Sequence, residues 1–207
     1  MIGIVDYGVG NLFSLGSSFA AIGAEVTVSR DAATLAACER IVLPGVGAFG
    51  DAARLLRESG MAELVLREAA AGKPVLGICL GMQLLFDRSL EYGDHAGLGL
   101  IPGTVRPIGE TVPAGLKIPH IGWNALHFVK KNPLFRYVGE GDHVYFVHSY
   151  HATDCDASTV AVTEYGATLC AAVAHGNVFG CQFHPEKSGA VGLSILRAFA
   201  EGEVVLC

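Results

Sequence analysis

The chain has 207 residues, of which 51% are hydrophobic and 16% are charged, a balance that suits a well-cored globular protein and argues against disorder. The formal net charge of -6 gives no electrostatic reason to expect nucleic acid or an anionic membrane as a partner. Mean hydropathy is high, at +0.44, but glycines and charged residues interrupt every apolar run before the roughly 18 residues that a membrane-spanning helix needs.

The six cysteines form no CxxC pair, and the N-terminal residues 1–8 lack the basic start of a secretory signal. We therefore expect reduced thiols and a cytoplasmic location. No set of cysteines and histidines has the spacing of a structural zinc site, although His148 and His151 make a metal-binding module conceivable. The sequence predicts no metal.

The first half of the chain alternates strands and helices. Apolar runs at residues 2–5, 24–28, 40–43 and 74–78 predict strands, with helical spacing after the first, third and fourth of them. Strands that are apolar on both faces and separated by helices indicate a parallel sheet covered on two sides.

The second half has a different texture. Short strands are predicted at residues 104–108, 117–121, 144–147, 160–163, 169–173 and 178–183, followed by a helix at 188–199. We expect a single α/β domain over residues 1–207, with a flavodoxin-like, mostly parallel sheet that continues into an antiparallel portion.

Cys79 stands between two glycines at the end of the fourth predicted strand and just before a helical pattern at residues 82–86. Gly77–Ile78–Cys79–Leu80–Gly81 is the pattern of a nucleophile elbow with cysteine in place of serine. The turn would expose the thiol at the carboxyl edge of the sheet and at a helix N-terminus, which favours a thiolate. A buried structural cysteine is the alternative.

A histidine and a carboxylate end another predicted strand, at His184–Pro185–Glu186. The proline disfavours helix at His184, so an extended segment should turn His184 and Glu186 to one side. A carboxylate that orients an imidazole, which in turn activates a thiol, is a catalytic triad. Parallel neighbouring strands would bring these residues to Cys79.

A glycine-rich loop at residues 44–50 follows the third predicted strand. It fits the dinucleotide fingerprint GxGxxG, but the next strand delivers Cys79 rather than the acidic residue that binds a ribose. We therefore expect no dinucleotide and no other cofactor. Its backbone N–H groups are instead free to face an oxyanion.

Together these segments resemble the class I (triad) glutamine amidotransferases. The narrower resemblance is to the glutaminase subunits of imidazole glycerol phosphate synthase, and it spans nearly the whole chain. It rests on residues 6–11, 44–52, 77–85, 117–124, 145–151 and 182–189.

The resemblance implies the chemistry and its residues. Cys79 would attack glutamine and form a glutamyl thioester, with His184 and Glu186 completing the triad. The oxyanion hole would involve Gly45, Val46, Gly47 and Leu80, and the substrate would contact Gln83, Ser149 and Tyr150. The residues alone favour a different interpretation, in which Gln83 is a solvated first-turn side chain and Ser149 and Tyr150 lie at a strand end.

The resemblance also implies a partner. Free ammonia is mostly protonated near neutral pH, so a second chain should receive it directly. This would be the cyclase subunit, a (β/α)8 barrel that makes imidazole glycerol phosphate and AICAR in histidine biosynthesis, joined as a heterodimer. The expected contacts are Pro119, His120, Trp123, Asn124 and Lys187, although Trp123 could instead pack in the core.

Two other enzyme classes remain open on sequence grounds. One is a cysteine peptidase or chaperone-like thiol enzyme that shares the elbow. The other is a glutamine amidotransferase of a different pathway, such as anthranilate or pyridoxal phosphate synthesis. The segment at residues 117–124 argues against the second. The tail at residues 203–207 lies outside every motif and is assigned no role.

Overall fold

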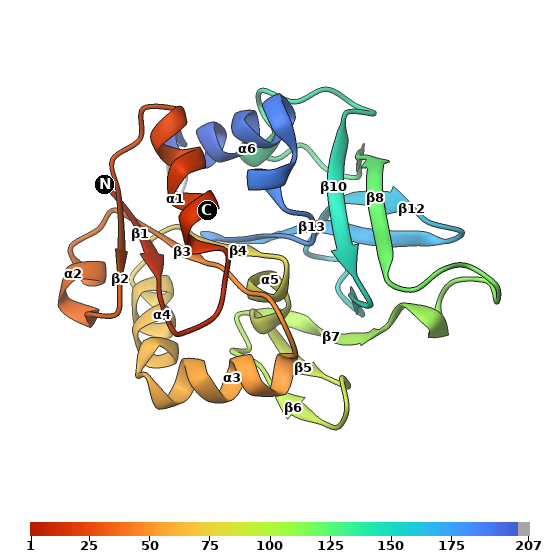
Figure 1. The fold of residues 1–207 in the computed structure, drawn as a ribbon, viewed down its shortest axis with the longest axis horizontal. Helices are drawn as coiled ribbons and strands as arrows, with labels where there is room; N and C mark the ends of the chain where they lie inside the picture. Colours follow the sequence, from red (N-terminus) through yellow and green to blue (C-terminus); the bar gives the residue numbers. More distant parts are fainter. Residues whose placement is uncertain (203–207) are drawn as a thin grey trace.

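The computed structural model describes residues 1–202, built around an eight-stranded sheet of order β2-β1-β3-β4-β14-β13-β12-β9 (Figure 1). Five neighbouring strands are parallel: β2 (Val26–Ser29), β1 (Ile2–Val5), β3 (Arg40–Leu43), β4 (Val75–Ile78) and β14 (Val178–Cys181). The rest is antiparallel: β13 (Thr168–His175), β12 (Thr159–Glu164) and β9 (His127–Phe128). The predicted mostly parallel α/β sheet with an antiparallel portion is confirmed.

Helices cover both faces of this sheet (Figure 1). One face carries α1 (Leu12–Ala21) and α6 (Gly189–Glu201), and the other carries α2 (Ala32–Ala36), α3 (Phe49–Glu58) and α4 (Met61–Ala70). Strand side chains alternate between the two layers: Ile4 packs in the core that contains Phe19 of α1, and Val5 in the core that contains Leu56 of α3. Both faces are therefore apolar, as the continuous hydrophobic strands predict.

Two smaller sheets lie beside the main one. β8 (His120–Ala125) pairs antiparallel with β10 (His143–His148). The other sheet has the order β11 (Tyr150–Thr153), β7 (Ile101–Pro107), β5 (Phe86–Ser89) and β6 (His95–Ala96). Short 3-10 turns complete the fold: η1 (Ile108–Glu110), η2 (Pro133–Phe135) and η3 (Pro185–Lys187).

The structure corrects several predicted boundaries. The helix after Cys79, α5, is only Leu80–Leu84, and Phe86 opens strand β5 instead of ending the helix. The strand expected at residues 117–121 begins at His120. The strands expected at 104–108, 117–121 and 144–147 belong to the two smaller sheets rather than to a continuation of the main sheet.

No helix within residues 1–202 is both long enough and apolar enough to span a bilayer. The tail at residues 203–207 lies outside the described residues.

Candidate active site

Cys79 occupies a strained turn between β4 and α5. Its φ of 53° and ψ of -112° are values that a non-glycine residue rarely adopts. The backbone is fixed on both sides, since the Cys79 N–H donates to the Cys181 carbonyl at 2.8 Å and the Cys79 carbonyl accepts from the Gln83 N–H at 3.1 Å. The neighbouring strand and the first turn of α5 thus hold the predicted elbow.

The glycines around this turn are required by space. A Cβ on Gly77 would lie 2.6 Å from the Gly81 carbonyl oxygen, and one on Gly81 would overlap the Leu43 carbonyl oxygen. A Cβ on Gly45 would lie 2.6 Å from the Gly81 nitrogen. The loop after β3 therefore packs directly on the elbow, backbone against backbone.

His184 reaches the elbow because β14 and β4 are parallel neighbours, with Cys181 opposite Ile78. The His184 Nδ1–H donates to the Glu186 Oε1 at 2.8 Å, and both side chains are only 3% exposed. The contact forms differently from our expectation, because only His184 is extended and Glu186 lies in the 3-10 turn η3. Pro185 starts that turn, as its fixed φ suits a first helical position.

The electrostatics of His184 favour its charged form. Burial alone lowers the pKa of the imidazole, but the nearby Cys79 sulfur and the bonded Glu186 carboxylate outweigh it and raise the pKa to about 9. The ring is therefore an imidazolium near neutral pH, in contact with a sulfur on one side and a carboxylate on the other. This arrangement can donate a proton to a leaving group.

A cavity of about 390 Å³ opens above the thiol. Cys79 and His184 line it, together with every residue predicted to contact the substrate or the oxyanion except Gly45: Val46, Gly47, Leu80, Gln83, Ser149 and Tyr150. Gln83 is buried rather than solvated, and its Nε2 donates to the Tyr150 carbonyl at 3.1 Å and to the Gln182 Oε1 at 3.0 Å.

The loop at residues 44–48 forms one rim of this cavity. The buried Tyr7 hydroxyl donates to the Pro44 carbonyl at 2.8 Å and holds the start of the loop. Gly47 has a φ of 94°, which a side chain would strain, and Val46 is exposed. Gly45 lies behind the rim, against Leu80 and Gly81.

Glu91 also lines the cavity, although nothing in the sequence pattern singled it out. It is buried between β5 and β6, and its Oε2 accepts the Phe49 N–H at 2.6 Å. Burial raises the pKa of this carboxyl, an effect that the Phe49 hydrogen bond opposes. Among residues 1–202, Glu91 is the one acidic side chain in the cavity wall.

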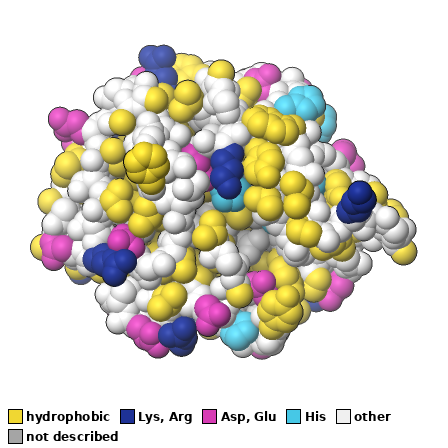
Figure 2. All heavy atoms as spheres, viewed as in Figure 1, with side chains coloured by type: hydrophobic (Ala, Val, Ile, Leu, Met, Phe, Trp, Pro, Cys, Tyr) yellow, Lys and Arg dark blue, Asp and Glu magenta, His cyan; other side chains and the backbone are white. Residues whose placement is uncertain are grey.

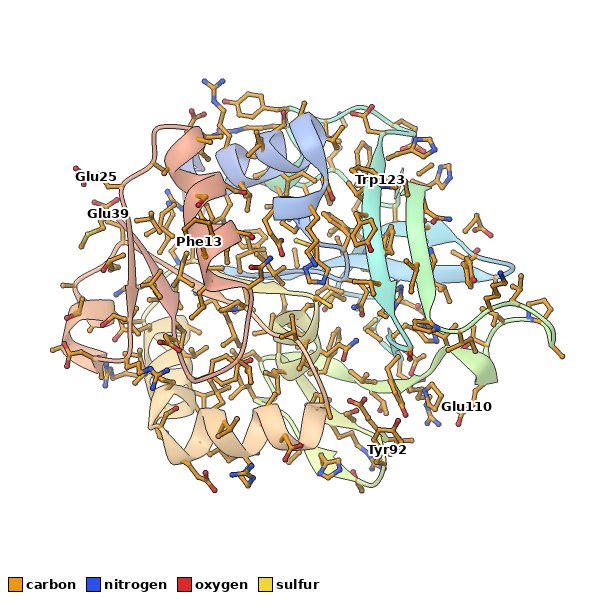
Figure 3. The ribbon with its side chains drawn as sticks, viewed as in Figure 1. Phe13, Glu25, Glu39, Tyr92, Glu110 and Trp123 are labelled. Carbon is orange, nitrogen blue, oxygen red and sulfur yellow. The ribbon has the colours of Figure 1, made fainter. Side chains whose placement is uncertain are left out.

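The residues expected at a partner surface are divided between the surface and the interior. Trp123 is 54% exposed on β8, which excludes ordinary core packing (Figure 3). Pro119 and Lys187 border the cavity, and the Lys187 ammonium lies 5.9 Å from the Tyr145 ring centroid. Figure 2 shows hydrophobic side chains gathered on the face that carries β8 and β10.

His120 does not lie at that surface. Its side chain is fully buried, stacked between the rings of Phe146 and Tyr165, so the expectation that it contacts a partner is wrong. Asn124 is half-buried. Its Oδ1 lies within hydrogen-bond distance of the His120 Nε2, and its Nδ2 donates to the Glu164 carbonyl. The alternation of β8 explains this, since His120 points away from the surface that its odd-numbered neighbours form.

Three buried histidines predict that the fold loses stability in mild acid. Burial lowers the pKa of His120, that of His148 to about 3 and that of His151 to about 4, so the unfolded chain binds more protons below pH 6.5. The stabilisation that depends on these neutral rings is therefore complete above that pH and is lost as the pH drops, by about 2 kcal/mol at pH 5 for each of His148 and His151.

Urea unfolding at pH 7 and pH 5 measures this loss. The lowered carboxyl pKa values, such as that of Glu68, act only below their unfolded value of 4.5, so they do not contribute in this window. His151→Gln should reduce the loss. Equal unfolding free energies at the two pH values would contradict the assignment of neutral buried rings.

Among residues 1–202 no group of three or more histidine, cysteine, aspartate or glutamate side chains could hold a metal ion. The fold and the site together define a class: an open α/β protein that carries a Cys–His–Glu arrangement at the carboxyl ends of two parallel strands. The model of the family described as class-I glutamine amidotransferase matches residues 3–201, and the chain belongs to this family.

Curated relatives match over the whole chain. "Imidazole glycerol phosphate synthase subunit HisH" of Caldanaerobacter subterraneus subsp. tengcongensis is 48% identical over 208 residues, covering 100% of both chains. The protein of the same name from Syntrophotalea carbinolica is 49% identical, covering 97% of this chain and 100% of the relative.

Solved structures share the fold at low identity. A crystal structure titled as a glutamine amidotransferase has a TM-score of 0.74 at 19% identity, covering 96% of each chain. The glutaminase domain of Trypanosoma brucei CTPS, solved with acivicin, has a TM-score of 0.61 at 18% identity, covering 100% of this chain and 96% of the other.

Proposed function

We propose that this chain, as one domain, is the glutaminase subunit of imidazole glycerol phosphate synthase and hydrolyses glutamine to glutamate and ammonia. The observation that carries the proposal is one cavity in which Cys79 and His184 meet, with Glu186 bonded to the far side of the imidazole. The relatives named for this synthase subunit, which match over the full length, support the choice of pathway, histidine biosynthesis.

In the first half-reaction Cys79 reacts as a thiolate, its proton being the one that His184 holds as an imidazolium, and the sulfur attacks the side-chain amide carbon of glutamine. The His184 imidazolium gives its proton to the amide nitrogen, the C–N bond breaks, and ammonia leaves a glutamyl thioester. In the second, neutral His184 takes a proton from water, whose oxygen displaces the sulfur and releases glutamate. Glu186 keeps the Nδ1–H of the ring pointed away from the sulfur throughout.

The negative oxygen of each tetrahedral intermediate needs hydrogen-bond donors. The Leu80 N–H at the start of α5 and the backbone N–H groups of the loop from Gly45 to Gly47 are the donors we assign. The close packing of Gly45 on Gly81 ties the two sides of this oxyanion hole together. Gly47 adopts a φ of 94° and has no side chain, so the backbone of the loop can change conformation there without steric strain.

Four cavity residues would hold the rest of the substrate. Gln83, Ser149 and Tyr150 offer hydrogen-bonding groups, and Glu91 offers a carboxylate for the α-ammonium group of glutamine. The Glu91 Oε2 already accepts the Phe49 N–H, so its Oε1 is the oxygen available to the substrate.

Glu91→Gln should raise KM for glutamine by about tenfold or more while leaving kcat within a few-fold, because it removes a charge that binds substrate and transition state equally. Steady-state glutamate release measures this. Glu63→Gln, on the surface of α4, is the control. A fall in kcat at unchanged KM would instead assign Glu91 to the chemistry.

The ammonia must reach a second chain before water protonates it. We propose that this chain is the cyclase subunit, a (β/α)8 barrel, joined as a heterodimer in the cytoplasm. The exposed apolar side chains of Ile118, Ile121 and Trp123, on the segment that begins beside the cavity-lining Pro119, support this face as the interface, with Pro119, Asn124 and Lys187 at its edge.

Trp123→Ala should weaken the heterodimer by about 2 kcal/mol or more, roughly 30-fold in Kd, because a half-exposed indole becomes buried on assembly. Titration calorimetry with the cyclase subunit measures it. Tyr137→Ala, also exposed but on a loop after η2, is the control. If the two variants bind the cyclase subunit with equal affinity, the interface does not include Trp123 and lies elsewhere on the chain.

The proposed function is tested by glutamate release with and without the cyclase subunit and its nucleotide substrate. We expect weak hydrolysis by the isolated chain and a large increase in the loaded complex, because wasteful hydrolysis is then avoided. If the cyclase does not affect glutamate release, the chain is a glutaminase that serves another partner. If no glutamate is released under any condition, the proposed activity is wrong.

A further inference from the structure

Two buried histidines connect Asn124, which is half-buried on β8, to the wall of the cavity. The His148 Nδ1 lies 2.8 Å from the Tyr150 carbonyl, the His148 Nε2 lies 3.0 Å from the His120 Nδ1, and the His120 Nε2 lies 2.8 Å from the Asn124 Oδ1. Both rings are buried, whereas Asn124 is half-buried on β8. The triad uses neither ring.

The two groups at the ends of this hydrogen-bonded series can only accept hydrogen bonds. The Tyr150 carbonyl is an acceptor, and the Asn124 Oδ1 faces His120 because its Nδ2 donates to the Glu164 carbonyl at 3.0 Å. Each of the three contacts, from the Tyr150 carbonyl through the two rings to the Asn124 Oδ1, needs one proton on a ring nitrogen to become a hydrogen bond. Two neutral imidazoles carry only two N–H protons between them. One contact is therefore unmade whenever the pair is neutral.

The neutral pair consequently has two arrangements. With both protons on Nδ1, His148 donates to Tyr150, His120 donates to His148, and the missing bond lies at Asn124. With both protons on Nε2, His120 donates to Asn124, His148 donates to His120, and the missing bond lies at the Tyr150 carbonyl. The inner bond reverses direction, so the two rings must change together.

The surroundings keep the pair neutral near pH 7. Burial lowers the pKa of His148 to about 3, and the neighbouring His120, His151 and His184 oppose a further positive charge. His120 is enclosed by the rings of Phe146 and Tyr165. Beyond His184 lie Glu186, which accepts its Nδ1–H, and Cys79.

We propose that His120 and His148 form a tautomeric relay, in which the engagement of the half-buried Asn124 amide of β8 decides whether His148 donates to the Tyr150 carbonyl in the cavity. Tyr150 lines the cavity, and its carbonyl also accepts from Gln83, so the relay positions two of its wall residues. In the isolated chain the missing bond falls at Asn124, where water can reach. The Glu164 contact already turns the Asn124 oxygen toward His120, so a partner that excludes water from this contact favours a bond from His120 to Asn124 and moves the missing bond to Tyr150.

The test compares two variants of nearly equal size at the surface end of the relay. Asn124→Asp offers only acceptors to the His120 Nε2–H, and Asn124→Leu offers none; both lose the bond to Glu164. Two-bond nitrogen–proton correlation spectra of the full chain, from about pH 7 to about pH 10, report which ring nitrogens carry protons. Asn132→Asp, at the start of η2, is the control.

We expect His148 to be protonated on Nδ1 in the native chain, the Leu variant and the control, and on Nε2 in the Asp variant. A His148 ring that keeps its Nδ1 proton in the Asp variant at every pH would overturn the relay, as would two rings in opposite tautomers.

A kinetic comparison, which rests on the proposed function, tests the effect on the cavity. The Asp variant should have a KM for glutamine at least about threefold above that of the Leu variant, the effect of one hydrogen bond. Equal values with a confirmed tautomer change would overturn the link to the cavity. A native chain that releases no glutamate would instead reject the proposed function, while the spectra would still decide the relay.

Discussion

Replacing Cys79 with alanine should abolish glutamine hydrolysis, by a factor of about 10⁴ or more, because among the described residues Cys79 is the one thiol that lines the cavity. Fold stability should change little. The thiol is small, and the elbow is held by backbone bonds to Cys181 and Gln83 that alanine keeps. The variant should also still bind the cyclase subunit.

The decisive comparison is with added ammonium salt in place of glutamine. Synthesis by the complex that contains Cys79→Ala should then match that of the native complex, because the cyclase would no longer depend on glutamine. Cys38→Ala, which removes a buried thiol outside the site, is the matched control for losing a sulfur. Loss of ammonia-dependent synthesis would mean that Cys79 shapes the interface rather than the chemistry.

Gly81→Ala should disrupt the elbow, with a loss of about 3 kcal/mol or more in the free energy of unfolding. The new methyl group would overlap the Leu43 carbonyl oxygen and lie 3.0 Å from the Pro44 carbonyl carbon, so β3 and α5 would have to separate. That separation also moves the Leu80 N–H away from the loop at residues 45–47. Glutamine hydrolysis should fall with the stability.

Gly16→Ala is the control for this substitution. Gly16 lies inside α1, and its added methyl would have only Val28 at 4.0 Å, so alanine should be neutral or stabilise the helix by about 0.5–1 kcal/mol. Chemical denaturation of the two variants measures the contrast. A Gly81→Ala protein as stable as Gly16→Ala would contradict the close packing at the elbow.

Much of this arrangement could be predicted because the signals are local. Gly77 and Gly81 flank Cys79 because a tight turn there leaves no space for side chains, and this pattern is visible within a few residues. The apolar run of β14 likewise predicts that His184 lies at the same edge of the sheet as Cys79. The contact between His184 and Glu186 was also predicted, but its backbone was not. Pro185 disfavours helix before itself and starts a 3-10 turn after itself, and only the first effect entered the prediction.

Other features depend on partners distant in sequence. Glu91 has no motif around it and becomes a cavity residue only because β5 and β6 bring it to the N-terminus of α3. Phe86 continues an apolar helical pattern, but pairing with Ile101 makes it a strand. His120 looks like a surface residue until β10 and Tyr165 cover it. Tertiary contacts override local pattern in each case.

The central claim is that the Cys79 sulfur forms a covalent bond to the side chain of glutamine. A diazoketone analogue of glutamine, followed by mass spectrometry of the digested protein, tests it most directly. We predict one label per chain, on Cys79, that is blocked by excess glutamine and lost in His184→Ala. A label on another cysteine, or an unlabelled Cys79 in a chain that releases glutamate, would contradict the account.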